Sequence, residues 1–165
     1  IAKREQFMIL DSDVLFFSAP NEMLGLMDRG IPFFMSDYQD GYVFAREVLA
    51  SRYDVELMPA FNTGVSYFSK AMDDPDFIER FCGDAERDGL LSHPWTEQTL
   101  FALLFARQAG VAQRLSPRHS ISRKPIDEQT VCHHFVNDGS RGDFYVRGIR
   151  RLRRMGFVRD AMSSG

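Results

Sequence analysis

The stretch that decides the fold is FMILDSDVLFF, residues 7–17, in which two aspartates interrupt an otherwise apolar run. Apolar runs of this length are typical of a strand that is buried on both faces. Burying two neighbouring carboxylates without a positive partner is costly. We therefore expect either a positive group between the side chains of Asp11 and Asp13, or the end of the strand at this point, where it opens into a site.

The spacing of the two aspartates indicates a divalent cation. Residues i and i+2 of a strand point to the same side, so Asp11 and Asp13 are predicted to face one way. Two carboxylates suit Mn²⁺ or Mg²⁺ and leave open positions for phosphate oxygens. The alternative is a strand end, where one aspartate caps the next turn and the other is solvated.

Length and composition indicate one ordinary domain over residues 1–165. The chain is 44% hydrophobic and 26% charged, as in soluble globular proteins, and its net charge of -3 favours no particular partner. Cys82 and Cys132 lack a metal-binding spacing, which predicts free thiols in a reducing, cytoplasmic compartment. No apolar run approaches the ~20 residues of a membrane span. The chain opens on Ile1 without an initiator Met, so we expect a piece of a longer protein.

Strand and helix patterns alternate along the chain, which predicts an α/β fold with a sheet of parallel and antiparallel strands. The expected strands cover residues 6–12, 31–35, 60–68, 111–116 and 129–136. The expected helices cover residues 18–29, 42–51, 73–88, 95–109 and 143–154. The helix at 95–109 has the clearest amphipathic pattern.

The last expected helix, at about 143–154, is strongly basic. Seven arginines stand between residues 141 and 159, against the single acid Asp143. Such a charge run suits phosphates or an anionic membrane surface, and a solvated helix face explains it equally well.

Two further stretches place polar groups near apolar ones. In AFNTGVSYF, residues 60–68, a glycine inside a strand indicates close approach of a ligand or another backbone, and Asn62 and Thr63 stand beside it. The alternative is a β-bulge with a local Asx turn. Glu97 and Gln98 open a helix, where the helix dipole explains them without any function.

Two histidines follow one another in VCHHFV, residues 131–136. Neighbouring residues of a strand face opposite sides, so at most one of them is expected to share a site with the aspartates. The loop at 137–142 is polar, and its amides and Arg141 could hold phosphate.

In this order, the stretches resemble the second half of a metal-dependent glycosyltransferase of the GT-A type, in the family of glycogenin and the bacterial lipopolysaccharide galactosyltransferases. ILDSD matches the family's Asp-x-Asp strand, and FNTGV matches a later strand. Glu97-Gln98 matches an acid–glutamine pair that opens a helix, and HHFVNDGSRG matches a late histidine before a Gly-containing loop. The likeness spans residues 7–145, but the family's Lys-Pro-Trp after that loop is absent.

The resemblance implies a metal site. Asp13 would bind Mn²⁺ or Mg²⁺ directly, and Asp11 would bind the metal, the ribose of the donor, or both. His134 best matches the third ligand because Phe135 follows it, and His133 competes with it for this role.

It also implies residues that contact the substrates. Asn62, Thr63 and Gly64 would face the donor sugar or the acceptor. Glu97 and Gln98 would lie near the anomeric carbon. Arg141 would contact the diphosphate in place of the family's lysine.

The implied activity is transfer of a sugar from a nucleoside-diphosphate sugar, above all a UDP-sugar, to a hydroxyl of a saccharide acceptor. Nucleic acid is not an expected partner, and peripheral membrane contact through the basic helix stays open. In the family's fold the base-binding part precedes the Asp-x-Asp strand, so we expect this chain to lack most of it and to bind nucleotide weakly.

Two other interpretations stay open. A phosphatase of the haloacid dehalogenase type also begins with Asp-x-Asp, and would use Asp11 as nucleophile and Asp13 as general acid. That motif favours Thr or Val where Leu15 stands. The other interpretation is a catalytically inactive binding module.

Overall fold

The longest strand, β4 (Phe61–Ser69), organises a four-stranded sheet in a computed structural model that describes residues 6–108, 110–121, 123–136 and 142–158. The order of this sheet is β1–β4–β3–β5, with β1 (Gln6–Leu10) and β3 (Phe33–Ser36) antiparallel to β4. The short β5 (Gln113–Arg114) is parallel to β3. The sheet therefore mixes parallel and antiparallel strands, as the sequence predicts.

A smaller sheet lies beside the first and has the order β2–β7–β6. In it β7 (Cys132–His134) is antiparallel to β2 (Val14–Phe16) and parallel to β6 (His119–Ile121). The sequence analysis missed β2 and β6, and it made the strands at β5 and β7 too long. Strands of three residues are too short to show an alternating pattern.

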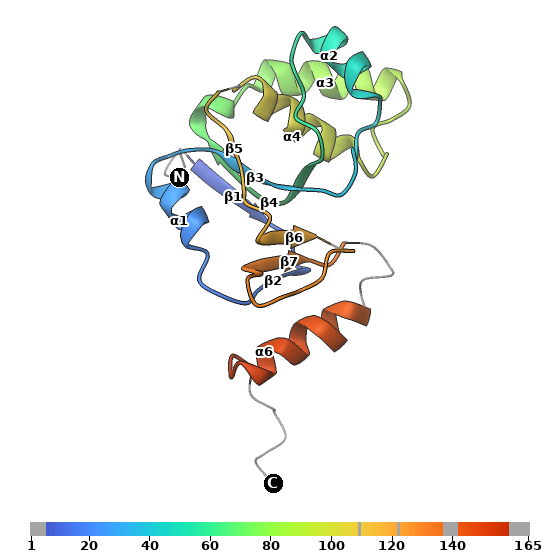
Figure 1. The fold of residues 1–165 in the computed structure, drawn as a ribbon. Helices are drawn as coiled ribbons and strands as arrows, with labels where there is room; N and C mark the ends of the chain where they lie inside the picture. Colours follow the sequence, from blue (N-terminus) through green and yellow to red (C-terminus); the bar gives the residue numbers. More distant parts are fainter. Residues whose placement is uncertain (1–5, 109, 122, 137–141, 159–165) are drawn as a thin grey trace, which may run out of the picture.

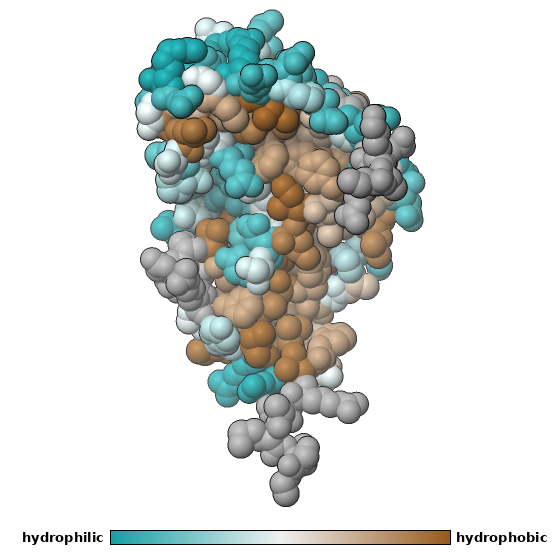
Figure 2. Space-filling view, turned by 180° about the vertical axis from the view of Figure 1, so that it is seen from behind, coloured by the Kyte–Doolittle hydropathy of each residue, from teal (hydrophilic) through white to brown (hydrophobic). Residues whose placement is uncertain are grey.

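The first strand departs most from the prediction. It ends at Leu10, before the aspartates, and lies at the edge of the sheet. Phe7, Met8 and Leu10 are 49%, 39% and 45% exposed, so the expected burial on both faces is wrong. The face opposite the one in Figure 1 carries a broad apolar area (Figure 2).

Three helices cover one face of the larger sheet: α2 (Arg46–Tyr53), α3 (Pro75–Arg87) and α4 (Thr96–Ala106), as Figure 1 shows. The ring of Phe105 in α4 contacts three further phenylalanine rings at centroid distances of 4.9–5.5 Å, those of Phe34, Phe61 and Phe68. Most of α4 is buried, so the amphipathic character expected at 95–109 is wrong. The aromatic cluster is the centre of the main core.

Helix starts agree with the sequence in part. The Asp74 side chain accepts a hydrogen bond from Phe77 N at 3.1 Å and caps α3, within the predicted helix at 73–88. The first helix, α1 (Asn21–Asp28), begins three residues after the predicted start at residue 18, and no side chain caps it. A 3₁₀ turn, η1 (Lys70–Met72), links β4 to α3.

The C-terminal helix packs against the smaller sheet. It consists of a π-helical part, η2 (Phe144–Ile149), and an α-helical part, α6 (Arg150–Arg154), close to the predicted 143–154. A Cβ atom added at Gly148 would lie 2.5 Å from Leu15 Cδ1 and 2.8 Å from Phe135 Cζ. The glycine therefore permits a close approach of the helix to β2 and β7.

Two chain-wide observations complete the fold. Neither cysteine forms a disulfide, and burial raises the pKa of the Cys132 thiol to about 12. None of the helices in the described part of the chain is both long enough and apolar enough to cross a membrane.

The aromatic cluster predicts the stability of the fold. Phe105→Ala is expected to lower the free energy of unfolding by about 3–5 kcal/mol, because it leaves a cavity among three rings. Urea unfolding measures this, with Leu24→Ala as the control, since Leu24 is 49% exposed. A loss in Phe105→Ala no larger than that of the control would contradict the assignment of the core.

Candidate active site

Three side chains with metal-binding atoms converge where β1, β2 and β7 meet. Asp11 and Asp13 lie between β1 and β2, and His134 is the last residue of β7. His134 Nε2 lies 3.0 Å from Asp13 Oδ1 and 3.3 Å from Asp11 Oδ2. The three ligand atoms all lie within 4.8 Å of one another.

Asp11 and Asp13 lie in a turn between β1 and β2 and not in a strand. Val14 N donates to Asp11 O at 3.2 Å, so the chain turns between the two acids. The expected strand geometry, with both side chains on one face, is therefore wrong, although both carboxylates reach the same histidine. Their side chains are 43% and 42% exposed, while that of His134 is 2% exposed.

Gly64 makes room for the histidine. A Cβ atom at this position would collide with Nδ1 and Cε1 of His134. The pairing of β3 with β4 shifts register between Phe34 and Met35, and Asn62 Oδ1 accepts from Gly64 N at 2.9 Å. Both alternatives from the sequence are therefore present. The strand has a β-bulge with an Asx turn at Asn62, and the group that lies close to Gly64 is the imidazole of His134.

A chain of hydrogen bonds orients the imidazole. Asn62 Nδ2 donates to Asp37 Oδ2 at 3.0 Å, which directs Asn62 Oδ1 toward His134 Nδ1, also at 3.0 Å. An oxygen at that distance favours the proton on Nδ1, so the Nε2 lone pair faces the carboxylates. This is the usual way in which a second residue prepares a histidine for a metal.

His133 points away from the aspartates. Its Nδ1 lies 2.6 Å from Ser120 Oγ, and its ring packs against Phe135. Burial, and to a smaller extent the positive charge of Arg147, lowers the pKa of His133 to about 4. Of the two histidines, His134 is the one that shares a site with the aspartates.

A hollow of about 480 Å³ opens beside this cluster. Four of the predicted substrate-contacting residues line the hollow: Asn62, Thr63, Glu97 and Gln98. Asn62 is buried and already forms a hydrogen bond to Asp37. Gln98 Nε2 donates to Gly41 O at 2.9 Å. Gly64 lies behind His134, and Arg141 falls outside the described residues.

The sequence analysis missed Asp37, Tyr38 and Trp95, which also line the hollow. Asp37 and Tyr38 follow directly after β3, and Trp95 directly precedes α4. A polar loop after a strand and a tryptophan before a helix were the available signals, but neither shows which side of the molecule it faces.

One cation lies close to Tyr38. The Arg123 guanidinium is 4.6 Å from the centroid of the Tyr38 ring. Arg123 has a φ of +76°, which costs free energy in a residue with a side chain and is commonest at functional sites. The described lining of the hollow contains carboxylates and no lysine or arginine, so Arg123 brings positive charge near an acidic hollow.

Two solved structures are similar to this chain. One is a glycosyltransferase involved in the glycosylation of the major capsid of PBCV-1, with a TM-score of 0.49 and 16% identity over 93% of this chain and 67% of that one. The other is mouse xyloside xylosyltransferase 1 in its apo form, with a TM-score of 0.53 and 13% identity over 85% of this chain and 60% of that one. The fold is that of a glycosyltransferase.

The likeness to the mouse enzyme concerns this fold alone, because the sequences are only distantly similar. The chain spans 60% of the length of the mouse chain. No family model matches the chain. No curated protein matches it in sequence either.

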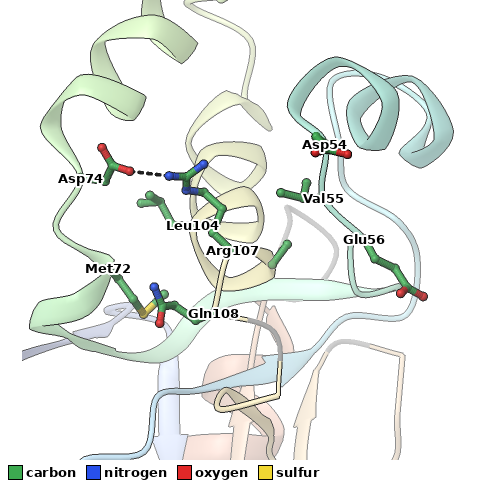
Figure 3. A pocket seen from close by; sticks show the side chains of 9 residues that line it. Asp54, Val55, Glu56, Met72, Asp74, Leu104, Arg107 and Gln108 are labelled. Carbon is green, nitrogen blue, oxygen red and sulfur yellow. Dashed lines mark hydrogen bonds and ion pairs between the residues drawn. The ribbon is translucent and has the colours of Figure 1, made fainter.

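A second hollow, of about 510 Å³, lies between α2, α3 and α4 (Figure 3). Two of its four charged side chains, Asp74 and Arg107, already stabilise the fold. Asp74 caps α3 and pairs with Arg107 at 2.7 Å, and the Arg107 guanidinium also lies over the Phe77 ring. We therefore assign no ligand to it.

The close contact between Gly64 and His134 predicts that a methyl group at position 64 lowers the stability of the protein. Gly64→Ala is expected to destabilise the protein by about 1–3 kcal/mol, because the imidazole must leave its place. Thermal unfolding measures this, with Gly83→Ala in α3 as the control, since nothing lies within 4 Å of a Cβ there. Equal stability of the two variants would show that His134 is not held against Gly64.

Proposed function

We propose that this chain transfers a hexose from a nucleoside-diphosphate sugar, most simply a UDP-sugar, to a hydroxyl of a saccharide acceptor. The observation that carries the proposal is the convergence of Asp11, Asp13 and His134 beside a hollow in a glycosyltransferase fold.

The three side chains fit an octahedral divalent cation. Neighbouring ligands about 2.1 Å from such an ion are about 3 Å apart. The distances from His134 Nε2 to the two aspartate oxygens are 3.0 Å and 3.3 Å. Carboxylates suit Mg²⁺ and Mn²⁺, and the imidazole favours Mn²⁺ between these two. When bound, the ion would neutralise the charge that develops on the departing nucleoside diphosphate.

The remaining groups would position the substrates. Glu97 and Gln98 lie in the first turn of α4 and line the same hollow as Thr63, where they can accept from and donate to sugar hydroxyls. Tyr38 and Trp95 add aromatic surface, which is common in small-molecule sites. Arg123 would add positive charge for the diphosphate, and Arg141 stays a further candidate for that role.

The chemistry follows from this arrangement. The acceptor oxygen forms a bond to the anomeric carbon while the bond from that carbon to the diphosphate oxygen breaks. The electron pair leaves with the diphosphate, and the proton of the acceptor passes to a diphosphate oxygen or to the Glu97 carboxylate. Asn62 holds His134 in place and takes no part in bond formation.

Metal affinity is the first quantity to measure. Wild-type protein is expected to bind Mn²⁺ more tightly than Mg²⁺ in calorimetry, and Asp13→Asn or His134→Gln is expected to remove most of that affinity. Asn62→Ala is expected to weaken Mn²⁺ binding about 10–100-fold, because it releases the imidazole. Asp28→Asn, an exposed acid in α1, serves as the control. Unchanged affinity in the first two variants would refute the metal site.

Activity tests the transfer itself. A screen of nucleoside-diphosphate sugars with the full-length protein is expected to show transfer or hydrolysis that needs Mn²⁺, stops when EDTA removes the ion, and is lost in Asp13→Asn. Turnover of an aryl phosphate that is blocked by Asp11→Asn, without any sugar transfer, would favour the phosphatase instead.

A further inference from the structure

The helix formed by η2 and α6, residues 144–154, carries an outward surface that the proposed function does not use. Four arginines of this helix are exposed: Arg147, Arg150, Arg153 and Arg154. Apolar side chains are exposed on and just after the same helix: Tyr145 (69%), Val146 (62%), Met155 (43%) and Phe157 (68%). A merely solvated face would be polar, so this combination of cations and large apolar groups needs another explanation.

The inner side of the helix is firmly packed. Gly148 lies against Leu15 and Phe135, and Leu152 belongs to a small core with Phe17 and Phe135. Figure 1 places this helix at the end of the molecule opposite α2 and α3. The exposed apolar groups therefore belong to a helix that is held in one orientation on the body of the protein.

The arginines surround a groove of about 520 Å³. Its lining consists of Arg147, Arg150, Arg151 and Arg154 with the apolar Ile126, Val146 and Met155, and contains no acidic residue. Asp143 pairs with Arg147 at 3.2 Å and is the single acid among residues 142–158, against five arginines. The lining of the groove thus carries four arginines and no acid, and anionic groups would relieve the repulsion between these arginines.

We propose that this helix docks on the surface of an anionic phospholipid bilayer. Lipid phosphates would occupy the arginine-lined groove, while Tyr145, Val146 and Phe157 would enter the interface between headgroups and acyl chains. Interfacial helices bind by this combination of buried apolar area and attraction to anionic lipid. Nucleic acid would use the arginines but would offer no apolar phase for Val146 and Met155, so we favour the bilayer.

The proposal is independent of sugar transfer, although docking would involve the candidate active site. Leu15 of β2 and Phe135 after β7 contact the helix at Gly148. Asp13 stands two positions before Leu15, and His134 stands directly before Phe135. A helix fixed on a membrane would therefore fix the orientation of the site relative to the lipid surface.

Vesicle flotation of the whole chain tests the proposal. Wild-type protein is expected to float with vesicles of phosphatidylcholine that contain one third phosphatidylglycerol, and not with pure phosphatidylcholine. Arg150→Gln with Arg154→Gln is expected to weaken this binding about 25-fold, at roughly fivefold for each arginine. The matched control, Arg29→Gln with Arg87→Gln, removes the same charge from two exposed arginines, one just after α1 and one at the end of α3, and should leave binding unchanged.

A second variant tests the contribution of the exposed apolar side chains. Tyr145→Ser with Phe157→Ser is expected to weaken binding to the anionic vesicles at both low and high salt, because insertion into the interface is not screened. Circular dichroism of each variant checks that the helix is retained. Equal flotation with both lipid mixtures, no flotation, or an Arg150/Arg154 variant that binds like wild type would overturn the proposal. Tighter binding of a single-stranded RNA oligonucleotide, measured by fluorescence anisotropy, would overturn it in favour of nucleic acid.

Discussion

The imidazole of His134 occupies a space that exists only because residue 64 has no side chain. This contact joins the two sheets, since Gly64 lies in β4 of the larger sheet and His134 in β7 of the smaller one. Asp37 and Asn62 then fix the orientation of the ring by hydrogen bonds. The acidic turn at Asp11 and Asp13, the hollow beside it and the pairing of β2 with β7 all depend on this placement.

The contact between Gly64 and His134 also explains the structural role of the bulge in β4. A regular strand would continue the ladder with β3, whereas the bulge turns the Asn62 amide and the Gly64 backbone toward the smaller sheet. A buried imidazole needs a hydrogen-bond partner, and Asn62 supplies it. The irregularity thus allows a polar side chain to be buried between two sheets.

The sequence predicts the class of fold and the members of the site better than their geometry. Asp11, Asp13, Asn62, Gly64 and a histidine at 133–134 all stand out as local irregularities in apolar runs, and the structure brings them together. Periodicity cannot tell an edge strand from a central one, so the exposure of Phe7, Met8 and Leu10 was not predictable. The bond between Asn62 and His134 joins residues 72 positions apart, and no local pattern reports it. The sequence analysis missed Arg123 and Tyr38 for the same reason. The role of Arg141 stays a prediction.

The three candidate ligands differ in their freedom to move. His134 is enclosed by Gly64 and Asn62, whereas the two carboxylates are attached to a turn and reach into solvent. If the proposed metal site is occupied, ions of different radius would be accommodated by displacement of the acidic turn, while the imidazole keeps its position. Replacement of a small cation by a larger one would then shift the start of β2 and leave β4 undisturbed. In the proposed metal site, the histidine ligand is therefore rigid and the two carboxylate ligands are adjustable.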